Sequence, residues 1–416
     1  MKKWVLAMAA TLMLFGACAQ ADYLLGQAAK DVGNIEQAIQ YWEESAAQGD
    51  AESAYELGIM YYYGDQVEKD YKKAKEYYLI AAEQGHMKAQ NTLGTMYFNG
   101  YGVDQDYAQA VEWFRKSAEQ NHAPAQYNLG VMYANGNGVE QNYQEAMKWY
   151  LKAVEQNHAG AQNNLGVMYA NGYGVEQDDE AAVMWYQKAA DQNDARAQYN
   201  LGVRYETGLG IEQNYQEAMK WYLKAVEQNH VKAQLNIGKM YKDGLGVDVD
   251  YAKAVQWCER AAALGNAEAT DITGWLYAQS EYGMKPDYEK AREYDQRAME
   301  MGRDNAIKNL AWLYMNGLGG EKDYAQAVCL YEMAAENEDA YAMSCLGWMY
   351  KTGGYGIEQN YEIAMEWLLK AAELGNADSM CWIGDFYNQG LGVEKNETLG
   401  QQWKDKALQN GHAHSN

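Results

Sequence analysis

The sequence predicts an all-α solenoid of about eleven helix-turn-helix repeats, each about 36 residues long. The first observation is a glycine, preceded in most repeats by Leu and followed three residues later by Tyr. It recurs every 36 residues at Gly58, Gly94, Gly130, Gly166, Gly202, Gly238 and Gly274, and the pattern continues at Ala311, Gly347 and Gly384. The second is length: 416 residues exceed what one hydrophobic core usually fills. A fixed period over such a length indicates stacked units, none of which can bury its apolar face alone.

Residues 123–157 show the first helix of a repeat, helix A, most clearly. Its apolar residues lie three and four positions apart, which is the spacing of one helical face. They are Ala125, Leu129, Met132 and Tyr133. Gly136 and Gly138 then end the helix, and Val139 is expected to fill the turn as a buried residue.

The second helix, helix B, begins at Tyr143 after a short polar stretch and has the same amphipathic spacing. Its core face is expected to hold Ala146, Trp149, Tyr150 and Ala153. Asn157 should end it, because Gly or Asn suits the left-handed conformation that follows many helices. The equivalent residues in other repeats are Gly49, Gly85, Asn121, Asn193, Asn229, Gly265 and Gly375.

This pattern of A-x-A-x-x-x-L-G-x-M-Y-x-x-G-x-G-V, then A-x-x-W-Y-x-K-A, resembles the Sel-one-like repeat family, a relative of the tetratricopeptide repeat. The resemblance covers roughly residues 23–411. It implies a right-handed α-solenoid superhelix with helix A on the concave wall. Such relatives act as adaptors for protein complexes, in secretion-related quality control and in bacterial contact with host cells. The resemblance implies no chemistry, so we expect no enzyme and no cofactor.

The ends of the chain differ from the repeats. Residues 1–21 have the features of an export leader, with Lys2-Lys3 followed by an apolar run too short to span a bilayer. Cleavage behind Ala21 would leave the repeats as residues 22–411; acylation of Cys18 in a lipoprotein leader is the less favoured alternative. The protein is therefore expected to be exported, to the periplasm or beyond. Tyr23–Gln48 is expected to cap the array, and residues 412–416 to be disordered.

Net charge is −24, which argues against nucleic acid because such binding depends on Lys and Arg neutralising phosphates. It also disfavours anionic lipid surfaces. A basic protein or extended peptide suits this charge better, although the charge also serves simply to keep a long exposed surface soluble. We expect a monomer.

One row of residues on helix A offers a way to hold such a peptide. The position two before the repeat glycine is Asn in five repeats: Asn128, Asn164, Asn200, Asn236 and Asn309. In tetratricopeptide solenoids this position faces the groove, where an amide can both donate to and accept from a peptide backbone. The alternative is that these side chains are solvated or cap locally.

The position after the repeat glycine changes from Thr or Val to Trp in the C-terminal half, at Trp275, Trp312 and Trp348. If helix A lines a groove, these rings are candidate binding anchors. The alternative is that they pack between repeats. The Trp residues of helix B and the helix A methionines, such as Met60 and Met132, are expected in the core.

Other constellations give weaker signals. His86, His122, His158 and His230 share one repeat position, so neighbouring ones should lie one helix spacing apart, too far for a shared zinc ion. They are expected in turns, at a position where Asp and Asn in other repeats would cap helix A. Cys329 and Cys345 could meet in a disulfide. No Ser has a Lys three residues later, as Ser-x-x-Lys chemistry requires.

The sequence thus favours an exported scaffold that binds another polypeptide through the groove. A carbohydrate- or peptidoglycan-binding module acting through the Trp row is the main alternative, and a hydrolase the weakest.

Cleavage behind Ala21 would give a mature chain that starts at Asp22 and carries no lipid. Intact mass spectrometry of the exported protein checks this directly. A diacyl or triacyl adduct on Cys18 would instead place the protein on a membrane.

Overall fold

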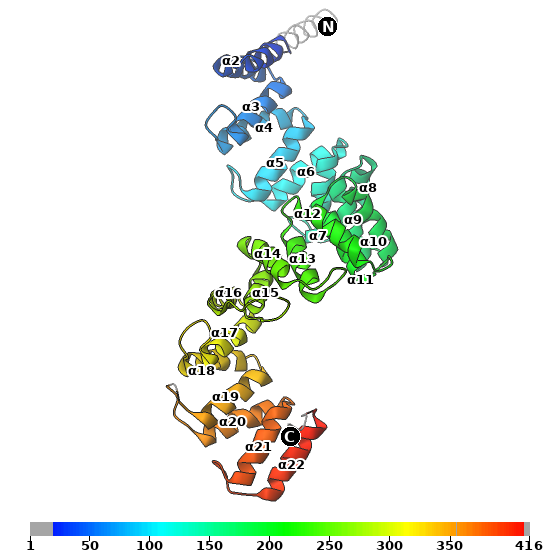
Figure 1. Ribbon diagram of the computed structural model, residues 1–416. Coiled ribbons are helices and arrows are strands. Elements are labelled where there is room, and N and C mark those ends of the chain that lie inside the picture. Colours follow the sequence, from blue (N-terminus) through cyan, green and yellow to red (C-terminus); the bar gives the residue numbers. More distant parts are fainter. Residues whose placement is uncertain (1–19, 355, 412–416) are drawn as a thin grey trace, which may run out of the picture. The chain divides into compact units, whose positions relative to one another are not determined.

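The computed structural model describes residues 20–354 and 356–411, and in this part the chain is helical almost throughout (Figure 1). Residues 20–31 form the first helix. The others are α2 Ile35–Ala47, α3 Ala51–Tyr63, α4 Tyr71–Glu83, α5 Met87–Asn99, α6 Tyr107–Glu119, α7 Ala123–Asn135, α8 Tyr143–Glu155, α9 Ala159–Asn171, α10 Asp179–Ala190, α11 Ala195–Thr207, α12 Tyr215–Val226, α13 Val231–Asp243, α14 Tyr251–Ala263, α15 Ala267–Tyr277, α16 Tyr288–Glu300, α17 Asp304–Asn316, α18 Tyr324–Ala335, α19 Ala340–Thr352, α20 Tyr361–Glu373, α21 Ala377–Gln389 and α22 Glu397–Gln409. The only extended pairing in the described chain is a single bridge between Gly354 and Ile357.

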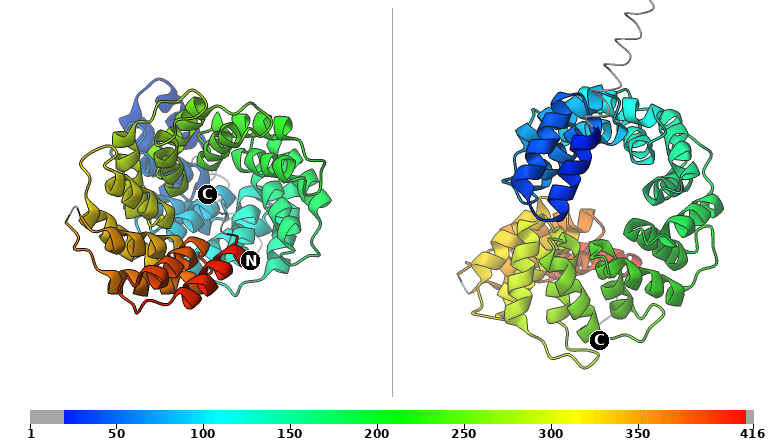
Figure 2. Two further views of the ribbon diagram at one scale, coloured as in Figure 1. Left: turned by 60° about the horizontal axis from the view of Figure 1, so that its bottom comes forward. Right: turned by 90° about the horizontal axis from the view of Figure 1, so that it is seen from above.

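The helices form the predicted pairs, with helix A odd-numbered from α3 to α21 and helix B even-numbered from α2 to α22. The chain divides into unit 1, up to Gln213, and unit 2, from Asn214. Within each unit every helix packs on the helices before and after it (Figure 2). The all-α solenoid is therefore confirmed, while its right-handed sense stays a prediction. None of the helices in the described ranges is long and apolar enough to cross a membrane.

The predicted limits of the repeat are confirmed residue by residue. Helix α7 ends at Asn135 and is followed by Gly136 and Gly138, with φ angles of 71° and 68°. Asn157, after α8, has a φ of 60°, and the glycines and asparagines named at the equivalent positions are also left-handed. Val139 is half-buried in the turn, so it is less enclosed than predicted.

The repeat histidines act as N-caps of helix A. The Nδ1 atoms of His86, His158 and His230 accept hydrogen bonds from the backbone N–H groups three residues later, at 3.1, 3.2 and 3.3 Å. Burial lowers the pKa of His158, which favours the neutral ring whose Nδ1 can accept. His122 differs, because its Nδ1 lies 3.1 Å from Ser117 Oγ and caps nothing. These side chains are turn residues, as predicted, and the structure assigns three of them a capping role.

The core of each repeat lies where helix A crosses helix B. Gly130 is fully covered by Tyr150, and a Cβ placed on this glycine would lie 2.6 Å from the tyrosine ring, closer than real Cβ contacts. Gly94 has the same relation to Phe114, and Gly166 to Tyr186. The helix A methionines are buried as predicted, with Met60, Met96, Met132, Met168 and Met240 at most 3% exposed.

The tryptophans of helix B pack at the edge of the core, so the expectation that they belong to it is confirmed in part. Trp113 and Trp221 are buried, but the other five (Trp149, Trp185, Trp257, Trp367 and Trp403) are half-buried. In all seven repeats the Lys or Arg three residues later lies over the ring, 3.7–4.7 Å from its centroid. A cation one helical turn away can cover an aromatic face. These rings therefore close the outer edge of each repeat instead of its centre.

The array changes at its ends and at one loop. Trp42 on α2 is fully buried against the helix of residues 20–31, as a cap requires. At the other end Gly400 on α22 is buried, and its carbonyl lies against Gly384. The irregular loop Ala278–Asp287 follows α15, which is two residues shorter than most A helices. The leader up to residue 19, including Cys18, and the tail of residues 412–416 lie outside the described residues.

Substituting Leu for Gly130 should destabilise the protein, because the larger side chain must displace Tyr150. We expect a cost of about 1–3 kcal/mol, confined largely to α7 and its neighbours. Thermal unfolding followed by circular dichroism measures the loss. Gln144→Leu, which puts the same side chain on the exposed side of α8, is the matched control. Equal stability of both variants would show that the helices need no glycine here.

Candidate binding site on the A helices

The predicted Asn row lies on the A helices, half-buried, with its amides already engaged in the chain. Asn128 Nδ2 donates to Asn91 Oδ1 of the preceding repeat at 3.0 Å, and Asn200 donates to Asn163 Oδ1 in the same way at 2.9 Å. These bonds tie neighbouring repeats together. Each amide therefore gives one N–H to the fold, and its oxygen and second N–H remain to meet a partner.

The other members of the row have different partners. Asn164 donates to the Tyr150 hydroxyl at 3.1 Å and accepts from Asn163 at 3.3 Å, so both ends of its amide are used. Asn236 donates to the Tyr222 hydroxyl at 3.0 Å. No group in the described parts of the chain donates to the Oδ1 of Asn128 or of Asn200. These two oxygens are the best placed of the row for a backbone N–H.

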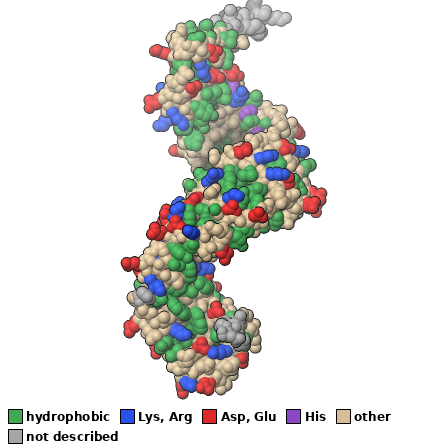
Figure 3. Space-filling view, in the orientation of Figure 1, with side chains coloured by type: hydrophobic (Ala, Val, Ile, Leu, Met, Phe, Trp, Pro, Cys, Tyr) green, Lys and Arg blue, Asp and Glu red, His purple; other side chains and the backbone are tan. Residues whose placement is uncertain are grey.

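Two adjoining pockets in unit 1 contain members of this row. The first, about 280 Å³, lies between α5 and α7 and is lined by Asn128, Thr95 and Val131. The second, about 310 Å³, lies between α7 and α9 and includes Asn164. Val131 lines both, so the pockets share a wall and follow one another along the A helices. Figure 3 shows the space-filling surface, with the histidines gathered on the visible face of unit 1.

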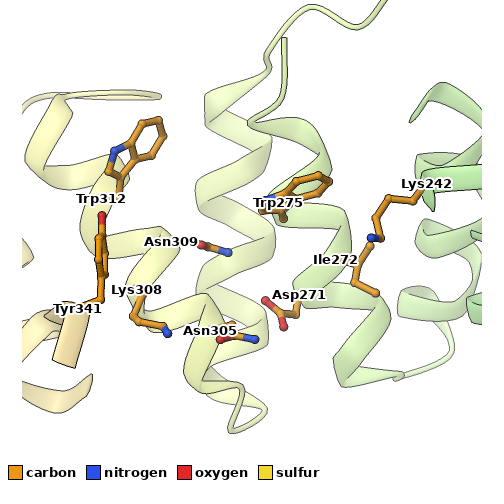
Figure 4. Close-up of a pocket in the computed structure, with 9 residues that line it drawn as sticks. All are labelled: Lys242, Asp271, Ile272, Trp275, Asn305, Lys308, Asn309, Trp312 and Tyr341. Carbon is orange, nitrogen blue, oxygen red and sulfur yellow. The ribbon is translucent and has the colours of Figure 1, made fainter. Parts of the chain in front are cut away.

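A larger pocket, about 500 Å³, lies on the A helices of unit 2; we call it the outer pocket (Figure 4). Helix α15 contributes Asp271 and Trp275, and α17 contributes Asn309 and Trp312. In Figure 4 the Asn309 amide lies between the two indole rings. Lys242, Ile272, Asn305, Lys308 and Tyr341 complete the wall. Two of the predicted tryptophans and one of the predicted asparagines therefore meet at one site.

The three tryptophans are not equivalent. Trp312 is 37% exposed, whereas Trp275 is half-buried with its ring edge-on to Tyr251. Trp348 packs edge-on against Tyr324, with ring centroids 6.3 Å apart, and does not line the outer pocket. Trp275 and Trp312 are therefore the members of the row that share a cavity.

Behind these rings lies an inner pocket of about 310 Å³, which Trp275, Asn309 and Trp312 share with the outer one. Its wall includes Asp295 of α16, whose side chain is 1% exposed. Neither carboxyl oxygen makes a well-formed hydrogen bond, although the side chain of Asn309 is close enough to interact with the carboxyl. A buried carboxyl without such bonds is unusual, because burial of a charge is expensive unless it is paired.

The pKa of Asp295 is raised to about 8, mainly by burial and also by the negative charge of Asp271, while the amide of Asn309 opposes the rise. The carboxyl is therefore mostly protonated near neutral pH. Sequence reasoning missed it, although a signal was present. In five earlier repeats the equivalent helix B residue is aromatic, namely Tyr78, Phe114, Tyr150, Tyr186 and Tyr222, and this series ends with Cys258 and then Asp295.

The four described cysteines are all free. Cys329 is exposed, whereas Cys345 is half-buried beside Tyr331, so the disulfide considered between them is not formed. Cys258 takes the place of the helix B aromatic against Gly238, and burial raises the pKa of its thiol to about 12. Such a thiol is unreactive, because the thiolate is the nucleophile. The described residues contain no group of three or more His, Cys, Asp or Glu that could hold a metal ion.

Comparison with known proteins gives a family and two similar structures. The Sel1 repeat model matches the chain at residues 19–50, 51–86, 88–122, 123–158, 159–194, 195–230, 231–266, 268–302, 305–339, 340–376 and 377–412. The crystal structure of c5321, a protective antigen present in uropathogenic Escherichia coli strains displaying an SLR fold, is 32% identical, with a TM-score of 0.76. That match covers 94% of this chain and 86% of c5321.

A Sel1 repeat protein from Oxalobacter formigenes is 33% identical, with a TM-score of 0.55 over 59% of this chain and 99% of that one. No curated protein matches the sequence.

Because of the Asp295 carboxyl, the free energy of unfolding should fall as the pH rises. Its pKa is about 8 in the folded protein against 3.8 for the unperturbed group. The folded state therefore holds more protons than the unfolded state between these values, and Asp295 lowers stability progressively as pH rises from about 4 to about 8. Replacing it by Asn removes this penalty.

Thermal unfolding at pH 5, 7 and 9 tests this. The melting temperature of Asp295→Asn should exceed that of the wild type by a margin that grows with pH. Glu293→Gln removes one exposed charge from the same helix and should leave the pH dependence unchanged. A constant difference between Asp295→Asn and wild type across the range would contradict the raised pKa.

Proposed function

The chain belongs to the Sel1 repeat family, and on that basis we propose that it is an exported scaffold, without catalytic activity, that binds another polypeptide through its A helices. The observation that carries this proposal is the coincidence between residues selected from the repeat pattern and the pockets. Asn128, Asn164, Asn309, Trp275 and Trp312 all line them.

The arrangement of the unit 1 pockets favours an extended ligand. Because Val131 lines both pockets, a chain lying across the A helices would pass from one to the next. The amide oxygens of Asn128 and Asn200 lie two repeats apart on this path and can accept from backbone N–H groups. Backbone recognition of this kind depends little on sequence, so side-chain pockets elsewhere must supply specificity.

Export is the second part of the proposal. The leader-like residues 1–21 support it, and so does the similarity to c5321, which is described as a protective antigen. We propose the periplasm or the cell exterior as the location, with a lipid tether at Cys18 as the alternative.

A carbohydrate-binding module is the second candidate function, because Trp275 and Trp312 flank the polar amides of Asn305 and Asn309. A sugar ring could stack on these indole rings while its hydroxyl groups bond to the amides. The buried carboxyl behind them favours a charged group instead.

The Asn row can be tested with variants that separate binding from folding. Asn128→Ala with Asn200→Ala removes the amide oxygens and also breaks the bonds to Asn91 and Asn163. Asn91→Ala with Asn163→Ala breaks the same two bonds from the other side and also the bond from Asn163 to Asn164, but leaves the amides of Asn128 and Asn200 in place. Each bond contributes about 0.5–1.5 kcal/mol, so the Asn91/Asn163 variant should lose at least as much stability as the Asn128/Asn200 variant.

Crosslinked partners recovered from the native envelope, quantified by mass spectrometry, give the measurement. The Asn128/Asn200 variant should recover several-fold less of the partner than the Asn91/Asn163 variant. Equal recovery by both would mean that the row is structural and that this face does not hold the partner's backbone.

A further inference from the structure

The outer and inner pockets of unit 2 contain one carboxyl group that pairs with no cation among the described residues. Lys242 pairs with Asp243, and Lys308 Nζ lies 2.7 Å from Asp339 Oδ2. Asp271 pairs with Arg303 at 3.2 Å. These three cations therefore each pair with one of three carboxylates.

That balance leaves Asp295 alone. Its two oxygens are buried without a well-formed hydrogen bond, and Trp275 and Trp312 line the same cavity. Helix α16 carries a nearby cation, Arg292, but its guanidinium donates to the carbonyls of Leu313 and Glu321 at 3.2 Å. The chain therefore keeps its own arginine away from the carboxyl.

The aromatic walls are suited to a cation. A guanidinium or ammonium group over an indole ring is attracted by the ring's electron-rich face, and the attraction grows when the cation is desolvated. Lys242 already uses Trp275 in this way, with its Nζ 5.6 Å from the ring centroid. A buried carboxyl in a cavity lined by two such rings offers a cation both aromatic faces and, once it has lost its proton, a counter-ion.

We propose that this site receives an arginine or lysine side chain of the partner polypeptide, with Asp295 as its counter-ion and Trp275 and Trp312 on either side. The planar guanidinium of arginine fits best, since it can stack on an indole and donate two parallel hydrogen bonds to one carboxylate. The combined size of the pockets is in the range of ligand sites. The net charge of −24 would attract a basic partner.

This inference rests on the proposed function, because it names the chemical group by which the same partner is recognised. It also predicts that binding changes the number of protons on the protein. Binding of a cation to the protonated carboxyl must break its O–H bond and release the proton to solvent. The groups that face Asp295 are Asp271 from α15 and the neutral Asn309 from α17, and Asp271 stays paired with Arg303 throughout.

Isothermal titration with a short peptide tests the site without the native partner. The probe is acetyl-Gly-Arg-Gly-amide, with the lysine peptide as a second probe and the citrulline peptide, a neutral isostere of arginine, as the control. The arginine probe should bind the full chain, the lysine probe more weakly, and the citrulline peptide not measurably. Titrations at pH 7 in buffers of different ionisation enthalpy should show release of roughly one proton per peptide, falling towards zero at pH 9.5.

Variants assign the binding to this carboxyl. Asp295→Asn should weaken the arginine probe on the order of ten-fold or more and abolish proton release. Trp312→Ala should weaken it several-fold while proton release persists. Glu293→Gln, which removes an exposed charge from the same helix, should change neither. Because Asp295→Asn removes a buried titratable group, it is expected to fold at least as well as the wild type.

Equal binding of the arginine and citrulline peptides would overturn the inference, and so would binding that Asp295→Asn leaves unaffected. A third contrary result is a neutral N-acetylglucosamine oligomer that displaces the arginine probe only from proteins that retain Trp312. That result would identify a sugar site. The probe does not depend on the Asn row in unit 1. Its failure is therefore distinguishable from failure of the scaffold proposal, which the Asn128/Asn200 variant reports.

Discussion

Most repeats depend on the contact between a glycine of helix A and a large side chain of helix B. At Gly130 no space remains for a Cβ, because the Tyr150 ring lies directly on the helix backbone. This contact sets how closely the two helices approach and therefore which residues of helix A stay at the surface. The capping histidines and left-handed asparagines hold the helix ends in register with it. The repeat tolerates variation elsewhere because this one approach is maintained.

In some repeats this contact is made by a residue that is not aromatic. Unit 2 replaces the helix B aromatic with Cys258 and then with Asp295, both still packed against the helix A glycine. A thiol fills the space and stays inert, whereas a carboxyl brings a charge that the neighbouring apolar residues cannot solvate. The outer and inner pockets lie at the second of these replacements. We infer that the helix B position that packs against the glycine in the regular repeats supplies, in this repeat, the carboxyl of the proposed site.

Much of this could be predicted from sequence, because the relevant interactions are local. The glycine period fixes the repeat, and helix ends follow from Gly136 and Asn157, whose left-handed conformation few other residues adopt. The helix B tryptophans were placed too deep, since periodicity gives a face but not how far a long side chain extends or that Lys152 covers Trp149. The role of Asp295 was not predictable in this way. Its meaning depends on Asn309 and Trp312, which belong to helix α17 of the next repeat and line the same pocket.

A solenoid can hold such a residue because its stability is a sum of neighbouring interactions. Destabilisation by a buried carboxyl falls on α15, α16 and α17, while distant repeats keep their own contacts. A globular domain with one cooperative core would bear the same cost throughout. The stability lost to the buried carboxyl can be recovered on binding, because a cation that pairs with Asp295 reduces the cost of burying its charge. The repeat that departs most from the common sequence is therefore also the one whose stability a bound ligand can increase most.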